Sequence, residues 1–146
     1  MQTTQKADDR WKFIHELDEE YLKGGVILSE WCVFIVRSAD LAFASGAFLA
    51  TILTAAAGIE AYLRSQQATS SASTLFQLIA GSELDQGHIE ELHAIRRYRN
   101  RWVHVANPCD DASLINEPEK LESELEEMSA RAVRVLRKTI YSDQWV

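Results

Sequence analysis

Between Asp40 and Glu60 the chain reads LAFASGAFLATILTAAAGI, nineteen residues (41–59) without a charge. This is nearly the length that a membrane-spanning helix requires. Twelve of the nineteen are Ala, Gly, Ser or Thr, so the run lacks the Leu, Ile, Val and Phe content that drives membrane insertion. The Ser45-Gly46 pair also interrupts it. The composition therefore favours a helix buried inside a bundle over a membrane span.

The Ser45-Gly46 pair divides this run between two predicted helices. Ahead of it, Ser29 can cap a helix whose apolar residues extend to Phe43, and Gly46 has the place of a C-terminal cap. Behind it, a helix over residues 47–66 carries apolar residues at helical spacing. Its Ala-rich small faces allow close approach of neighbouring helices, so this helix should form the centre of the bundle.

Further helices are predicted on both sides of this hairpin. An N-terminal amphipathic helix is predicted over residues 8–23, a short bracing helix over 75–81 and a long helix over 85–105. A last helix begins beyond Asn116, with Pro118 in its first turn. No run predicts a strand. The expected fold is all-α, an up-and-down bundle of four to five main helices with the extra N-terminal helix packed across one side. We expect a single domain over residues 1–146, with residues 1–7 as a disordered tail.

Charge and cysteine content limit the functions that fit this chain. Its formal net charge of −7 argues against a surface that binds nucleic acid as a whole, so any RNA site must be local. Cys32 and Cys109 are far apart, and the N-terminus lacks the apolar core of a signal peptide, which predicts a cytoplasmic protein with reduced thiols. His93, His104 and Cys109 lack the spacing of zinc ligands, so we expect no metal and no other cofactor.

The stretch HAIRRYRNRWVHV, residues 93–105, contradicts the global charge because it holds four arginines within six positions. One interpretation is a solvated helix face whose arginines pair with Glu60, Glu90, Glu91 or the acidic start of the last helix. Within this stretch, Asn100 and His104 share a helix face, whereas Arg99 and His104 are about 140° apart around the axis. These groups converge on one cleft only if a second subunit supplies the opposite wall.

The segment RNRWVH, residues 99–104, resembles the R-x4-6-H motif of the HEPN superfamily, including the polar residue after the Arg. Residues 38–64 are similar to the first helical hairpin of that family, in which a Gly separates two helices and a Glu precedes an apolar pair. The resemblance implies a four- or five-helix bundle that forms a homodimer with the two motif helices facing each other. It also implies an endoribonuclease that needs no metal, in a toxin–antitoxin, phage-defence or RNA-processing setting, with an antitoxin or another protein as a possible partner.

The residue types of the motif suit this chemistry. Histidine exchanges a proton near neutral pH, so His104 is the candidate for proton transfer. A guanidinium holds the negative charge that develops on phosphoryl oxygens, which is the expected role of Arg99, and Asn100 is expected to position phosphate or His104. The predicted guides for the RNA backbone are the other arginines of the stretch, Arg96, Arg97 and Arg101.

Several alternatives remain open at this point. Glu60 either orients Arg99 in the active site or pairs with Arg64 at i,i+4. The whole chain is either a ribonuclease, a non-catalytic HEPN domain for dimerisation or partner binding, or an unrelated helical interaction domain. The ribonuclease hypothesis predicts an exposed His104 and Arg99, whereas the non-catalytic one predicts that they are buried or salt-bridged. Tyr98 and Trp102 are predicted to be structural residues, and His15 and His88 are predicted to lie at the surface.

Overall fold

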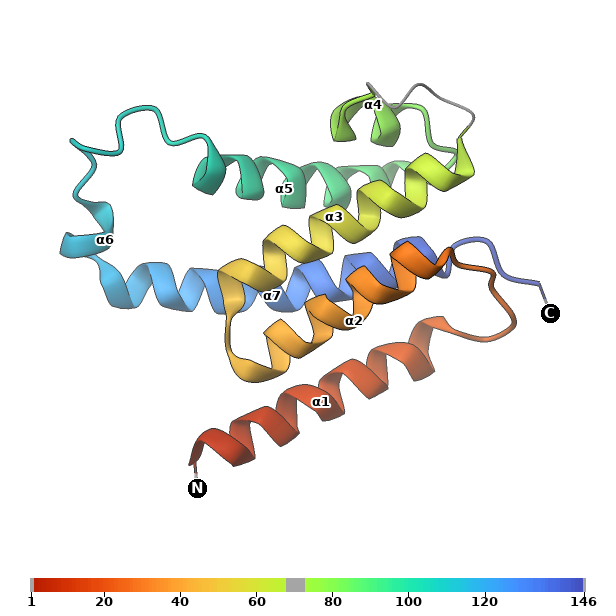
Figure 1. The fold of residues 1–146 in the computed structure, drawn as a ribbon, viewed down its shortest axis with the longest axis horizontal. Coiled ribbons are helices and arrows are strands. Elements are labelled where there is room, and N and C mark those ends of the chain that lie inside the picture. Colours follow the sequence, from red (N-terminus) through yellow and green to blue (C-terminus); the bar gives the residue numbers. More distant parts are fainter. Residues whose placement is uncertain (1, 68–72, 146) are drawn as a thin grey trace.

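The computed structural model describes residues 2–67 and 73–145 and is built from helices (Figure 1). In this part of the chain they are α1 (Gln2–Tyr21), α2 (Glu30–Ser45), α3 (Phe48–Gln66), α4 (Leu75–Ala80), α5 (Gln86–Val103), α6 (Ser113–Asn116) and α7 (Pro118–Ile140). The long helices α1, α2, α3, α5 and α7 run alternately up and down. The described residues form no strand, and their single isolated bridge joins Gly25 to Trp145. The predicted all-α bundle is confirmed.

The α2–α3 hairpin is fixed by the two caps that the sequence predicts. The Ser29 hydroxyl oxygen accepts a hydrogen bond from the Cys32 backbone N–H (3.1 Å) at the start of α2. At the other end Gly46 adopts a left-handed conformation with φ 83°, and its N–H donates to the carbonyl of Phe43 (3.0 Å). This conformation strains any residue with a Cβ, which explains a glycine at the turn.

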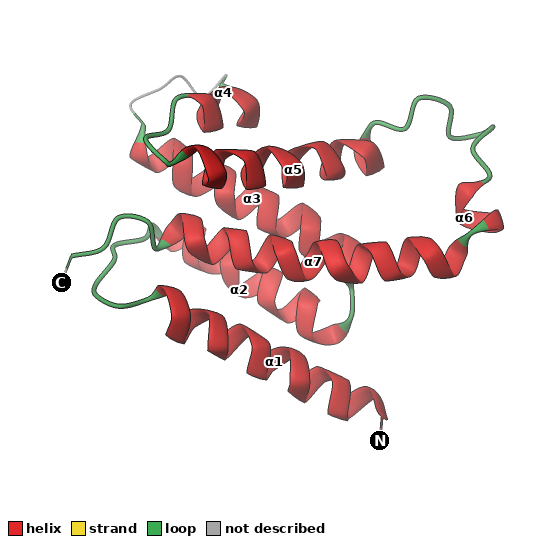
Figure 2. Ribbon diagram, turned by 180° about the vertical axis from the view of Figure 1, so that it is seen from behind, coloured by secondary structure: helices red, strands yellow, loops and turns green. Residues whose placement is uncertain are grey.

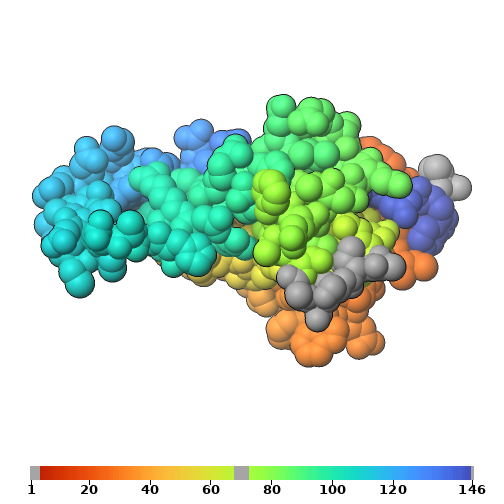
Figure 3. All heavy atoms as spheres, turned by 90° about the horizontal axis from the view of Figure 1, so that it is seen from above, coloured from red at the N-terminus to blue at the C-terminus, as the bar shows by residue number. Residues whose placement is uncertain are grey.

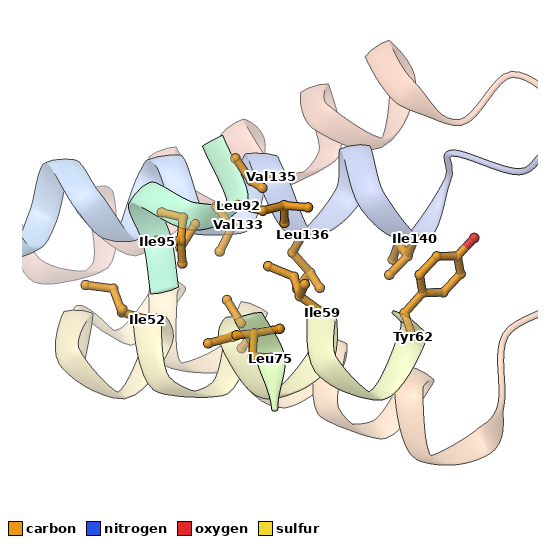
Figure 4. Close-up of a cluster of buried hydrophobic side chains, with 14 of the residues drawn as sticks. Ile52, Ile59, Tyr62, Leu75, Leu92, Ile95, Val133, Val135, Leu136 and Ile140 are labelled. Carbon is orange, nitrogen blue, oxygen red and sulfur yellow. The ribbon is translucent and has the colours of Figure 1, made fainter. Parts of the chain in front are cut away.

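The core lies mainly between α3 and α7, and Leu92 and Ile95 of α5 pack into it (Figure 4). Ile52 and Ile59 of α3 and Leu136 of α7 are at most 1% exposed. A Cβ at Gly58 would lie 3.1 Å from Cδ1 of Leu136, so the glycine lets α7 pack close to α3. Full burial of one such aliphatic side chain contributes about 1.5–3 kcal/mol. The prediction that the helix over 47–66 is central is confirmed, and no helix of the described residues is long and apolar enough to cross a membrane.

Helix α1 begins earlier than the sequence predicts. It starts at Gln2, so residues 2–7 are helical rather than a disordered tail. No Gly or Pro interrupts this segment, and Gln5 donates to Asp9 (3.2 Å) across one turn. Ile14 and Leu17 are buried where α1 packs on α2 and α7.

A buried ion cluster joins α1, α2 and α7. The Arg137 guanidinium, 2% exposed, donates two hydrogen bonds to the Asp40 carboxylate (2.8 and 2.7 Å) and a third to Asp18 (2.9 Å). In the sequence, the last helix has acidic residues in its early turns and basic residues in its late turns, which indicates only a favourable interaction with the helix dipole. The structure shows that Arg137 also connects three helices through the core.

The helix α5 differs from its prediction in two respects. It ends at Val103, because His104 leaves the helical region with φ −125° and ψ 47°. His88, predicted at the surface, is 3% exposed, so that prediction is wrong. Its Nε2 lies 2.8 Å from the Thr139 hydroxyl, which itself donates to the carbonyl of Val135, so Nε2 must carry the proton. The polar residues around His88 in the sequence suggested exposure, whereas the side chain faces α7.

Candidate functional site

The helix α5 is held along α7 at both ends (Figure 2). Near its start, Nε2 of His88 lies 2.8 Å from the Thr139 hydroxyl of α7, and Glu91 pairs with Lys138 of α7 (2.9 Å). Near its end, Arg101 pairs with Glu124 of α7 (2.6 Å). These contacts fix the rotation of α5 about its axis and thereby the direction of its other arginines.

Three arginines of α5 have no carboxylate partner among the described residues. They are Arg96, Arg97 and Arg99, and we call them the arginine cluster. Burial lowers the pKa of Arg96, and the positive charges of Arg97 and Arg99 lower it further. This mutual repulsion is uncompensated although the protein carries a net charge of −7. The cluster is therefore a local positive site on an acidic protein.

Arg96 is positioned by aromatic side chains. Its Nε donates to Nδ1 of His93 (3.2 Å), and its guanidinium lies 5.1 Å from the centre of the Phe76 ring. Burial, followed by the charges of Arg96 and Arg97, lowers the pKa of His93. Both observations favour a neutral His93 with its proton on Nε2. The contribution of Phe76 was not predicted, since α4 is separate from the motif in sequence.

Arg99 and Asn100 form a hydrogen-bonded pair. The Asn100 side-chain oxygen accepts from Nη2 (2.7 Å) and Nε (3.2 Å) of Arg99. Both side chains are half-buried. A neutral amide orients the guanidinium without cancelling its charge, which leaves Arg99 suited to hold an anion. Asn100 contacts His104 only through the backbone, where its carbonyl accepts from the His104 N–H (2.9 Å).

His104 caps the C-terminal end of α5, and its imidazole ring is exposed. No hydrogen bond of this ring occurs among the described residues. The ring borders a hollow of about 430 Å³ between the end of α5, the loop that follows, α6 and α7. Apolar side chains of Trp102, Pro108, Leu114 and Leu121 line much of this hollow. His104 is thus accessible to a ligand as large as a nucleotide.

Glu60 pairs with Arg64 at 2.7 Å, which is the second of the two alternatives drawn from the sequence. No contact between Glu60 and Arg99 occurs in the described part of the chain. The i,i+4 spacing brings the two side chains together on the same face of α3. Within one copy, Glu60 therefore does not orient Arg99.

Tyr98 and Trp102 pack against the core, as predicted for structural residues. Their polar atoms, Oη of Tyr98 and Nε1 of Trp102, are buried without a hydrogen-bond partner of good geometry among the described residues. Burial is the main cause that raises the pKa of Tyr98, and the nearby Glu124 raises it further. Tyr98 lies within the arginine cluster and Trp102 just after it, so buried polar atoms and unpaired arginines occur on the same part of α5.

A single copy brings Arg99 to Asn100, and no hydrogen bond joins either side chain to the His104 ring among the described residues. Among the described residues, no three His, Cys, Asp or Glu side chains form a group that could hold a metal ion. Comparison of the chain with protein-family models, with curated proteins and with solved structures gives no match. The functional argument therefore depends on the geometry and charge of α5.

Proposed function

We propose that this protein is a metal-independent endoribonuclease of the HEPN type, with its active site between the α5 helices of a homodimer. The arginine cluster is the observation that carries the proposal: Arg96, Arg97 and Arg99 have no carboxylate partner in the described part of the chain, although the protein is acidic. Uncompensated arginines are costly in an isolated protein and favourable beside a phosphate backbone. The exposed His104 on the same helix supplies a group that can move a proton.

The proposed reaction is the attack of an RNA 2′-hydroxyl on the adjacent phosphorus. The oxygen–phosphorus bond forms as the bond to the 5′-oxygen breaks, and the products are a 2′,3′-cyclic phosphate and a 5′-hydroxyl. His104 takes the proton of the 2′-hydroxyl or gives one to the leaving 5′-oxygen. Arg99, oriented by Asn100 at 2.7 Å, donates to the phosphoryl oxygens on which charge develops. Arg96, Arg97 and Arg101 would attract the backbone on either side.

The angular separation of Arg99 and His104 supports a dimeric site. Ideal helical spacing would separate the two residues by about 140°, and His104 stands where the helix ends, so a single helix does not direct both side chains at one phosphate. A two-fold axis between two α5 helices would set His104 of one copy opposite Arg99 of the other. Both half-sites would then be complete and identical.

The decisive experiment compares wild type, His104→Ala and His15→Ala on a mixed RNA substrate in EDTA. His15 is also an exposed histidine and lies on α1, so it is the matched control. We expect cyclic-phosphate products from wild type and His15→Ala, and a loss of about 10²–10⁴-fold in His104→Ala. Light scattering should show the same oligomeric state for all three proteins. Equal cleavage by all three, or by none, would contradict the proposal.

The second candidate is a non-catalytic HEPN domain that binds an antitoxin or another protein. It is favoured by exposed apolar side chains near the end of α5 and on α6: Val103 (48%), Leu114 (59%) and Ile115 (83%). The ion pair of Arg101 with Glu124 also fits this alternative, since it removes one arginine from RNA. This candidate would be supported if the wild-type protein cleaves no RNA but binds a protein partner, and if Ile115→Ser abolishes that binding.

A further inference from the structure

The outward face of α2 carries large apolar side chains that nothing in the described chain covers. Trp31 is 79% exposed, Phe34 66% and Leu41 49%, and they lie along one stripe of the helix. Ile27, 80% exposed, precedes the helix and borders a separate hollow with Tyr62 and Trp145. Figure 3 shows the orange start of α2 projecting from the body of the molecule. We call Trp31, Phe34 and Leu41 the α2 stripe.

The size of the α2 stripe is that of a binding surface. Its three side chains expose on the order of 500 Å², which equals the largest apolar patches of typical monomers. A standard interface buries about 800 Å² on each partner, so the stripe supplies more than half of one. Cys32, Ala39 and Phe43 on the opposite face of α2 already fill the core. The stripe is thus additional to the apolar surface that folding uses.

Two unpaired charges accompany the stripe on the same side of α2. Glu30 and Arg37 are exposed, and neither has an ion-pair partner among the described residues. They stand seven residues apart, about 10 Å along the helix. Their midpoint falls between residues 33 and 34, beside the exposed Phe34. The two opposite charges therefore stand at nearly equal distances on either side of Phe34.

We propose that a second copy of this chain covers the α2 stripe, with the two α2 helices antiparallel about a two-fold axis near Phe34. In that arrangement Phe34 packs on its own counterpart at the axis, and Trp31 and Leu41 of each copy extend the apolar contact to either side. Glu30 of each copy meets Arg37 of the other, so both unpaired charges gain a partner. An isologous contact requires this self-complementarity, whereas an unrelated partner would not require the pattern to be symmetric.

This contact is distinct from the proposed pairing of α5 helices. In Figure 1, α2 and α5 lie on opposite sides of α3, and no direct packing between them occurs. One copy can therefore use α2 and α5 at the same time. The inference does not depend on ribonuclease activity, since no residue of α5 takes part.

The test reverses the charges and then mixes the variants. Glu30→Arg alone and Arg37→Glu alone place like charges together at both ends of the contact, so each should associate at least about tenfold more weakly than wild type in sedimentation. An equimolar mixture of the two sets opposite charges together again at both ends and should restore association. Association that is unchanged in each single variant, or not restored on mixing, would overturn the proposal, as would a monomeric wild type.

A cross-link checks the position of the two-fold axis independently of charge. Phe34→Cys in a Cys109→Ser background removes the exposed native thiol and places one thiol near the axis. We expect a disulfide-linked dimer under mild oxidation, and none for the matched control Ile115→Cys, whose site is 83% exposed on α6. Equal cross-linking at both sites, or none at residue 34, would contradict the antiparallel arrangement.

Discussion

Two groups of arginines in this protein have opposite environments. Arg137 of α7 is 2% exposed and donates to two carboxylates, those of Asp40 and Asp18, at 2.7–2.9 Å. Arg99 of α5 is half-buried and donates to a neutral amide, and the nearby Arg96 and Arg97 have no carboxylate partner among the described residues. The first arrangement connects three helices. The second reaches beyond α5 only where Arg96 lies on the Phe76 ring of α4, as far as the described residues show, and it keeps its charge available.

The difference indicates which arginines the fold needs. A buried guanidinium without carboxylates would unfold the protein, so the partners of Arg137 are part of the core. Repulsion within the arginine cluster costs stability, and no carboxylate among the described residues offsets it. Residues that reduce stability without a structural role are typical of functional sites. The predictions below test whether the two groups separate in this way.

The largest effect is expected from Arg137→Ala. It leaves the Asp40 carboxylate, 9% exposed, buried without its partner, which should lower the free energy of unfolding by about 3–5 kcal/mol. Urea denaturation at a fixed protein concentration measures the loss. Arg131→Ala is the control, because Arg131 is exposed on the same helix and contacts only Met128. A loss below about 1 kcal/mol would place Arg137 outside the structural group.

Arg99→Ala should have the opposite profile. Removal of an unpaired cation beside Arg96 and Arg97 should leave the free energy of unfolding within about 0.5 kcal/mol of wild type, or raise it slightly. RNA cleavage should fall about 10²–10³-fold, since a donor to the phosphoryl oxygens is lost. Unfolding and cleavage assays on the same preparation check both. If stability falls as far as in Arg137→Ala, the functional interpretation of the cluster is wrong.

His88 should make stability depend on pH. Burial, with the positive charge of Lys138, lowers the pKa of His88 below its ordinary value of 6.5. Between that lowered value and 6.5 the unfolded chain binds the proton and the folded chain does not, so stability should fall as the pH decreases below 6.5. Glu91 and Asp85 oppose this shift only in part.

The matched variant is His88→Gln, which can still donate to Thr139 but does not titrate. It should weaken the pH dependence of the unfolding midpoint between pH 7 and pH 5, at a cost of about 1–2 kcal/mol at neutral pH. Thermal unfolding across this range measures both quantities. An unchanged slope in His88→Gln would show that other groups cause the acid sensitivity.

Much of the fold followed from local signals in the sequence. Ser29, Gly46 and Pro118 mark helix ends through hydrogen bonding and backbone conformation that involve only near neighbours. Burial of charged and titratable residues was not predictable in the same way. The burial of Arg137 and His88 depends on partners 51–119 residues away, which no local pattern specifies.

The candidate site was predictable in its residues more than in its contacts. The density of arginines in residues 93–105 and the spacing of Arg99 and His104 are properties of one stretch of sequence. The pairing of Arg99 with Asn100 depends on side-chain rotamers, because adjacent helix residues do not face each other. The contact of Arg96 with Phe76 depends on how α4 packs, which the sequence of α5 does not contain.

Arg101 tests the boundary between the two groups, and the smallest effect is expected there. It lies on α5 with the arginine cluster but pairs with Glu124 at 2.6 Å, and its side chain is 55% exposed. A double-mutant cycle with Arg101→Ala and Glu124→Ala should give a coupling energy of about 0–1 kcal/mol that decreases with added salt.

Release of Arg101 should in turn affect RNA binding. Glu124→Gln removes the competing carboxylate, so one further cation can contact phosphate, and the salt dependence of RNA affinity should steepen by about one unit or less. Glu127→Gln, on the exposed surface of the same helix, is the control for the lost negative charge. A steeper slope in Glu124→Gln alone would assign Arg101 to the arginine cluster. Equal slopes, together with a coupling above about 1 kcal/mol, would assign it to the structural group with Arg137.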